Sequence, residues 1–199
     1  MKIKGTFLAA LVLMAASLAT VPAVAAEYDI DPAHSSIEFQ VKHLAISRTK
    51  GTFGEFSGTF AFEAGKPETW SCEATIKAAS VDTGNEDRDN HLRSPDFFNV
   101  EEFPVLTFKS TGVEFDGDSE GTLRGELTIH GVTRVVELEL EILGTASDPW
   151  GNDRAGFSAE TKINRKDYGL TWNKALETGG LVVGEDVKIV LEVEGIKKK

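Results

Sequence analysis

The sequence predicts an all-β fold, an extended eight-stranded antiparallel barrel with short helices in the connections. Three observations support this prediction. Apolar and polar residues alternate along eight separate segments, turn-forming residues separate these segments, and helical signals are confined to short stretches between them. Period-two alternation is typical of strands that bury one face.

The alternation is clearest in residues 36–42, 135–142 and 187–193. In each of these segments every second residue is Ile, Leu, Val or Phe, and most of the residues between them are polar. Weaker alternation predicts the remaining five strands, so the total is eight. These weaker segments are residues 51–63, 69–78, 105–115, 120–130 and 154–163.

Turn chemistry separates the predicted strands. Asp116-Gly117-Asp118 and His130-Gly131 favour tight hairpins, and residues 148–152 favour a longer loop. Consecutive strands are therefore expected to be antiparallel neighbours.

Helical signals are short. Asn85 and Ser94 are expected N-caps, the second followed by a proline at the first helical position. Residues 43–48 and 165–168 could each form one further turn. Arg88, His91 and Arg165 are expected to position loops around the mouth of the barrel rather than to perform chemistry.

Eight such strands could pack as a sandwich or close into a barrel. Closure removes the exposed strand edges, so we favour the barrel. Several segments have ten or more residues, against a usual strand length of about 5–6. At about 3.3 Å per residue the barrel would be roughly 30–40 Å long along its strands. The interior of an eight-stranded barrel is either filled by side chains or holds one small ligand.

The predicted inner faces mix large and small residues. Phe56 and Phe108, for example, share faces with Gly58, Gly125 and Ala159. Small residues could let large neighbours interdigitate into a filled core, or they could leave a lumen. Taken alone, the pattern slightly favours the filled core.

Residues 1–25 have the features of a secretory signal peptide. Lys2 and Lys4 precede an uncharged run over residues 5–19, and Ala23-Val24-Ala25 forms an A-x-A cleavage site. We therefore expect export, cleavage of residues 1–25, and a single domain over residues 26–199.

Charge argues against several classes of partner. Without Lys2 and Lys4, 19 of the 21 basic residues remain against 32 acidic residues, a formal charge of −13. Such a chain repels phosphate backbones and anionic head groups. Nucleic acid is not expected as a partner, and neither is stable membrane insertion.

The sequence offers little catalytic chemistry. The four histidines, His34, His43, His91 and His130, show no metal-ligand spacing, and Cys72 is the only cysteine. Cys72 shares a face with apolar residues and is expected to act as a small buried hydrophobe. We predict no catalytic residues and no metal site.

Several motifs follow one another along the predicted domain. They are Tyr28-Asp29-Ile30-Asp31-Pro32-Ala33-His34-Ser35, Gly51-Thr52-Phe53, Ser80-Val81-Asp82-Thr83, Arg88-Asp89-Asn90-His91-Leu92-Arg93-Ser94, Gly125-Glu126-Leu127-Thr128-Ile129-His130-Gly131, Asn164-Arg165-Lys166-Asp167-Tyr168-Gly169 and Gly179-Gly180-Leu181-Val182-Val183-Gly184. The order of these motifs resembles the YceI-like proteins, a family of periplasmic polyisoprenoid-binding barrels. The resemblance spans residues 28–184 and so covers most of the predicted domain.

The resemblance implies a lipocalin-like barrel in the periplasm that holds a long isoprenoid chain, as of a quinone or a polyprenyl lipid. It implies no established catalysis and no cofactor other than this lipid, and it reverses the preference for a filled core. We expect the inward-facing large residues to contact the ligand. These are Phe39, Val41, Phe56, Phe60, Phe62, Trp70, Phe108, Leu127, Leu138, Leu140, Phe157 and Leu191.

Two other functions stay open at this point. One is a histidine- or metal-dependent enzyme that acts on lipids or peroxides. The other is a stress-protective domain with a filled core. A homodimer is also compatible with the sequence.

Overall fold

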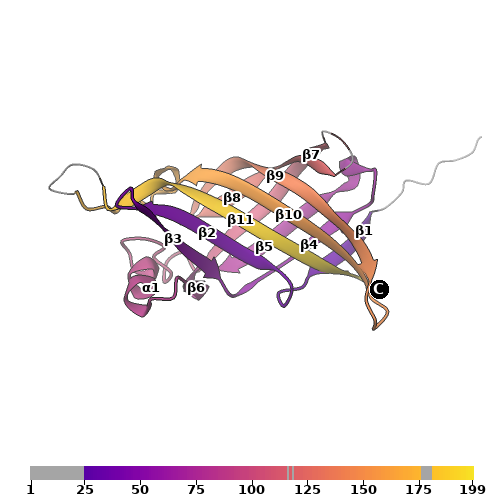
Figure 1. The fold of residues 1–199 in the computed structure, drawn as a ribbon, viewed down its shortest axis with the longest axis horizontal. Coiled ribbons are helices and arrows are strands. Elements are labelled where there is room, and N and C mark those ends of the chain that lie inside the picture. Colours follow the sequence, from indigo (N-terminus) through magenta and orange to yellow (C-terminus); the bar gives the residue numbers. More distant parts are fainter. Residues whose placement is uncertain (1–24, 116, 118, 176–180) are drawn as a thin grey trace, which may run out of the picture.

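The computed structural model describes residues 25–115, 117, 119–175 and 181–199. These residues form one elongated barrel (Figure 1). Residues 1–24 of the predicted signal peptide are outside the described residues. Asp116 and Asp118, which belong to one of the predicted hairpins, are also outside them.

Eleven strand segments form one sheet in the described part of the chain. Three short 3-10 helices and one α-helix connect them. The strands are β1 (Ala26–Ile30), β2 (Ser36–His43), β3 (Ser47–Phe53), β4 (Phe56–Phe62), β5 (Ser71–Lys77), β6 (Val81–Asp82), β7 (Val105–Phe115), β8 (Glu120–Ile129), β9 (Val132–Ser147), β10 (Asp153–Asn164) and β11 (Val183–Lys197), and the helices are η1 (Pro67–Thr69), η2 (Ala78–Ser80), α1 (Glu86–Arg93) and η3 (Arg165–Tyr168).

The sheet closes on itself as an eight-stranded antiparallel barrel. Its hydrogen-bonded order is β1-β4-β5-β7-β8-β9-β10-β11, and β1 pairs again with β11. Strand β2 follows β1 along the same edge of β11, and β3 pairs with β2 beside it. Because the order is closed, each of these eight strands has a hydrogen-bonded neighbour on both sides. The predicted fold class is confirmed.

Several local predictions are confirmed as well. Asn85 caps α1, because its side-chain oxygen accepts a hydrogen bond from the backbone N–H of Arg88 at 3.0 Å. Residues 165–168 form η3. His130 and Gly131 both have positive φ, 51° and 72°, as a two-residue hairpin of the primed type requires.

Other local predictions are wrong. Residues 43–48 are not a helical turn but the tip of the β2–β3 hairpin, where Leu44 and Ala45 have φ of 52° and 60°. Ser94 ends α1 instead of starting a helix. Strand β1 went unrecognised, because a five-residue segment offers too few alternations to detect.

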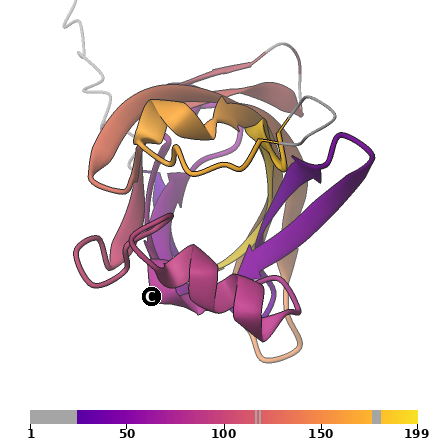
Figure 2. The ribbon, with the colours of Figure 1, turned by 90° about the vertical axis from the view of Figure 1, so that its left-hand side faces the viewer.

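Helix α1 and the segment that contains η3 lie at the same end of the barrel. Figure 2 looks at this end, with α1 in magenta across one side and the orange segment containing η3 across the other. We call it the α1 end. Strand β1 and the C-terminus lie at the opposite end (Figure 1).

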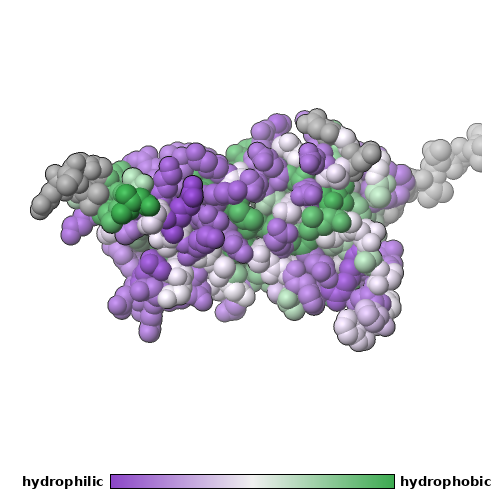
Figure 3. All heavy atoms as spheres, viewed as in Figure 1, coloured by the Kyte–Doolittle hydropathy of each residue, from purple (hydrophilic) through white to green (hydrophobic). Residues whose placement is uncertain are grey.

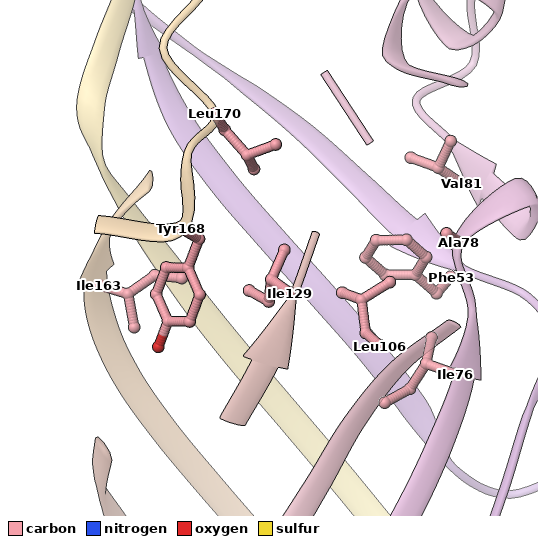
Figure 4. Packing of buried hydrophobic residues seen from close by; sticks show 9 residues of the cluster. All are labelled: Phe53, Ile76, Ala78, Val81, Leu106, Ile129, Ile163, Tyr168 and Leu170. Atoms are coloured by element: carbon pink, nitrogen blue, oxygen red, sulfur yellow. The ribbon is translucent and has the colours of Figure 1, made fainter. Parts of the chain in front are cut away.

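A cluster of buried apolar side chains lies beneath the α1 end. Figure 4 shows its members pointing toward one another from the strands, from η2 and from the segment around η3. They are Phe53, Ile76, Ala78, Val81, Leu106, Ile129, Ile163, Tyr168 and Leu170.

Candidate ligand cavity

An elongated apolar cavity of about 260 Å³ lies inside the barrel. This volume is close to the lower end of the range of small-molecule pockets. Eleven of the twelve predicted residues line the cavity, and their contact with a ligand stays a prediction. The eleven are Phe39, Val41, Phe56, Phe60, Trp70, Phe108, Leu127, Leu138, Leu140, Phe157 and Leu191.

Phe62 is the exception. It is buried on the inner face, as its position in the alternation predicted, but it packs behind the cavity wall. Its ring lies 4.5 Å from Trp70 and 5.1 Å from Phe157, measured between ring centroids. Period two identifies the face of a strand but not the position along the barrel axis.

The cavity also has lining residues that the prediction missed. Some, such as Ile37 and Val187, lie on the faces that the alternation had already identified. Leu92, Phe97 and Leu170 belong to α1 and to the connections, where no strand period exists.

Glycines and alanines on the inner faces have different roles. Ala74 and Ala159 line the cavity, whereas Gly51 and Gly125 do not. A Cβ atom added to Gly51 or Gly125 would overlap a phenylalanine ring on the neighbouring strand.

The rings in question belong to Phe39, beside Gly51, and Phe108, beside Gly125. The glycines therefore let these rings lie against the wall instead of projecting inward. Phe60 lies against Gly195 in the same way.

Six aromatic rings close one end of the cavity, and we call them the aromatic cluster. Neighbouring centroids lie 4.5–6.5 Å apart. Three of the rings line the cavity and the other three lie behind them. The lining rings are Phe60, Trp70 and Phe157, and the rings behind are Tyr28, Phe62 and Phe115.

Three rings meet at the α1 end. The centroid of His91 lies 4.8 Å from Trp172 and 5.1 Å from Phe97, and Phe97 lies 5.3 Å from Trp172. They join α1 to the segment that follows η3. Of the three, only Phe97 lines the cavity.

The three polar residues predicted to position loops make contacts of that kind. Arg165, only 3% exposed, donates from Nε to the carbonyl of Gly184 at 2.8 Å and from Nη1 to the carbonyl of Leu170. Burial lowers the pKa of Arg165. Arg88 donates from Nε to Thr83 Oγ1 at 2.7 Å, and His91 contacts Asp96 at 2.8 Å.

Cys72 lines the cavity wall. Burial raises the pKa of its thiol to about 11, so at neutral pH it is a protonated thiol and a poor nucleophile. Its role matches the small hydrophobe that the sequence indicated.

One group of potential metal ligands occurs among the described residues. Asp31, His34 and Glu194 each offer a ligand atom within 4.8 Å of the others. Arg154 donates to Asp31 at 2.8 Å and to Glu194 at 2.5 Å. The guanidinium therefore already supplies the positive charge that these carboxylates require.

The family model of the YceI-like domain matches residues 28–195. The chain belongs to the YceI-like family. "Protein YceI" of Salmonella newport strain SL254 is 43% identical over 179 residues, which cover 89% of this chain and 90% of that relative.

Solved structures show the same fold. The YceI protein of Campylobacter jejuni is 36% identical, with a TM-score of 0.69 over 79% of this chain and 90% of its own. BcnA of Burkholderia cenocepacia, 23% identical, has a TM-score of 0.74 over 83% and 98%. A structure described as a polyisoprenoid binding domain from Saccharophagus degradans, 18% identical, has a TM-score of 0.66 over 87% and 99%.

None of the helices in the described ranges combines the length and the apolar composition that a membrane crossing requires.

Proposed function

We propose that this YceI-like protein is a carrier or storage protein that binds one long polyisoprenoid, of a quinone or polyprenyl lipid, in its barrel. The observation that carries the proposal is the apolar cavity that extends from the α1 end to the aromatic cluster. A domain of the same fold is described as polyisoprenoid-binding, which supports this ligand class.

Burial of the chain supplies the affinity. At about 0.8 kcal/mol for each CH₂ group removed from water, a few isoprene units contribute several kcal/mol. Apolar contacts discriminate weakly between chains, by roughly 1–3 kcal/mol per methylene. The protein should therefore accept related chains and select mainly by length.

The cavity sets the length that fits. On β11 its lining extends from Val183 to Val193. Ten residues at about 3.3 Å, in a strand tilted by about 40° from the barrel axis, give roughly 25 Å. We place the tail end of the ligand at the aromatic cluster and its head group at the α1 end.

The proposal includes the cellular compartment. The cleavage site after Ala25 supports export, with residues 26–199 as a single lipid-binding domain in the periplasm. Fractionation of the producing cells and N-terminal sequencing test this. A protein in the membrane fraction with Met1 retained would contradict it.

Native mass spectrometry followed by organic extraction tests the main proposal. Protein purified from bacteria under gentle conditions should carry about one long apolar lipid per chain. Protein purified after delipidation and refolding is the control and should take up an added polyprenyl lipid. If neither preparation held lipid, the carrier proposal would fail.

The same preparations address the alternatives. A filled core predicts no lipid, and the cavity of about 260 Å³ favours the carrier over it. A metal-dependent enzyme predicts stoichiometric metal in elemental analysis of the purified protein.

A further inference from the structure

The β2–β3 hairpin differs in charge from the rest of the chain. The hairpin, residues 36–53, contains Lys42, Arg48 and Lys50 against a single acidic residue, Glu38, although the whole chain has 32 acidic residues. The chain as a whole is therefore negatively charged, but this hairpin is locally positive.

The three cations share the outer surface of the hairpin. All three are exposed. Lys42 lies directly opposite Arg48 in the strand register, and Lys50 lies opposite Gln40. Like charges in directly opposite positions destabilise a strand pair. The charges of Lys42 and Arg48 therefore do not stabilise the pairing of β2 with β3.

Several exposed lysines elsewhere on the barrel face acidic partners. Lys109 pairs with Glu73 at 2.7 Å and Lys188 with Glu160 at 2.6 Å. Within the ranges that the structure describes, Lys42, Arg48 and Lys50 form no ion pair within 4.0 Å.

The tip of the same hairpin is apolar. Ile46 is 85% exposed, and the left-handed backbone of Leu44 and Ala45 forms the turn that presents it. Leu181, 40% exposed, is adjacent, because the N–H of Leu44 donates to the carbonyl of Val182 at 2.9 Å. Figure 3 shows apolar side chains gathered at this end of the molecule.

A surface groove of about 420 Å³ joins the two features. It is lined by the three cations together with Gln40, Ala45, Ile46 and Ser47. An exposed apolar tip flanked by cations is the combination by which peripheral proteins bind anionic membrane surfaces.

The hairpin also borders the α1 end of the ligand cavity. Val41 of β2 lines the cavity, while Lys42 next to it is exposed on the outer surface. Val183, another lining residue, pairs with His43 at the end of the hairpin. A surface bound by this hairpin would therefore lie beside that end of the cavity.

We propose that the β2–β3 hairpin docks on a bilayer that contains anionic phospholipid. Lys42, Arg48 and Lys50 contact the head-group phosphates, and Ile46 enters the interface. Docking holds the α1 end of the cavity against the membrane, where an apolar lipid could pass without crossing water. The use of docking for lipid transfer rests on the proposed function, but the docking itself does not.

Vesicle sedimentation tests this proposal. The protein should bind vesicles of phosphatidylglycerol and phosphatidylethanolamine, but not vesicles of phosphatidylcholine alone, and salt should weaken the binding. Each cation near an anionic surface is worth about fivefold in affinity. The variant K42Q/R48Q/K50Q should therefore lose at least tenfold.

A matched control removes the same charge elsewhere. K109Q/K197Q/K198Q changes three exposed or half-exposed lysines that pair with carboxylates away from the hairpin. It should bind vesicles like the parent protein. Ile46→Ser should weaken binding severalfold while the dependence on salt remains.

Three outcomes would overturn the proposal: equal binding by the two triple variants, equal binding to phosphatidylcholine, or a hairpin variant that alters only self-association. Melting temperature confirms that each variant is folded. Lipid content, measured on the same preparations, separates the two proposals. If the protein carries lipid but does not bind vesicles, only the docking proposal is refuted. If it binds vesicles but carries no lipid, only the carrier function is refuted.

Discussion

The two ends of the barrel are built in different ways. The end with the aromatic cluster is formed mainly by rings on strands of the closed sheet, so moving these rings disturbs the barrel. At the α1 end, the rings of His91, Phe97 and Trp172 sit on a short helix and on connections. Segments with few strand hydrogen bonds open at lower free energy than strands. A ligand should therefore enter at the α1 end and stop at the aromatic cluster.

Polar contacts reinforce this difference. At the end opposite α1, Arg154 joins three acidic residues that lie far apart in the sequence. It donates to Asp31 at 2.8 Å, to Asp148 at 2.9 Å and to Glu194 at 2.5 Å. These contacts connect the start of the barrel to β10 and β11 and oppose opening there.

The largest expected effect comes from a change between the two ends. Ala159 lines the cavity opposite Leu140 and Leu191. Ala159→Phe should place a ring in the path of the ligand and remove nearly all bound lipid. Overpacking should cost the fold only about 1–3 kcal/mol. Lipid per chain is measured by extraction and native mass spectrometry.

Ala146→Phe is the matched control, because Ala146 is exposed on β9. It should keep its lipid. A destabilised Ala159→Phe protein that retained a full complement of lipid would show that the cavity is not the binding site.

The next largest effect is expected at the aromatic cluster, where the tail of the bound lipid should end. Phe157→Ala removes a lining ring, so the cavity should extend toward Phe62 and hold longer chains than the parent protein. Because Phe157 is only partly buried, its truncation should lower the free energy of unfolding by no more than about 3–5 kcal/mol. The chain lengths retained from a mixture of polyprenyl lipids give the measurement.

Phe103→Ala provides the comparison, since Phe103 packs on His130 outside the cavity. It should destabilise the protein without changing the preferred length. If Phe157→Ala left the preferred chain length unchanged, the aromatic cluster would not be what limits the length of the bound lipid.

A smaller effect is expected at the α1 end. Trp172→Ala removes the ring that joins α1 to the segment after η3, so the lipid should exchange several times faster while its preferred length stays constant. Transfer of a fluorescent polyprenyl lipid to acceptor vesicles measures the rate. Trp150, 80% exposed on another loop, is the control, and Trp150→Ala should exchange at the parent rate. Equal rates for both variants would refute the assignment of the entrance.

The smallest effect depends on pH and concerns the opposite end. A hydrogen bond from Arg154 lowers the pKa of Asp31 from 3.8 to about 2. The folded state therefore favours the ionised carboxylate. This stabilisation is complete above about pH 4 and is lost as the pH falls through about 2. Urea unfolding between these pH values should show a decline in the free energy of unfolding as the pH falls. This decline should be smaller in Arg154→Met. An unchanged pH profile in that variant would exclude this cause.

Much of this comparison could be predicted from the sequence, because burial on one face of a strand imposes period two. That pattern identified eleven of the residues that line the cavity, including Phe39 and Leu191. It failed at Phe62, whose face was right but whose position along the axis depends on strand stagger. It missed Leu92 and Leu170, which reach the cavity from connections.

Two further properties depend on the folded arrangement. The net charge of the chain suggested repulsion from anionic head groups. A sum over all residues does not show that the β2–β3 hairpin has the opposite charge. The inner glycines could either leave open space or admit large neighbours, and the structure shows that Phe39 and Phe108 occupy the space beside Gly51 and Gly125.

The contact between these phenylalanines and their glycines has an evolutionary consequence. A side chain at Gly51 requires that Phe39 move, and a side chain at Gly125 requires that Phe108 move. Such positions are expected to vary in pairs among relatives, since a side chain added at the glycine alone pushes the ring into the lumen. Divergence of the binding specificity should therefore proceed by coupled substitutions across neighbouring strands.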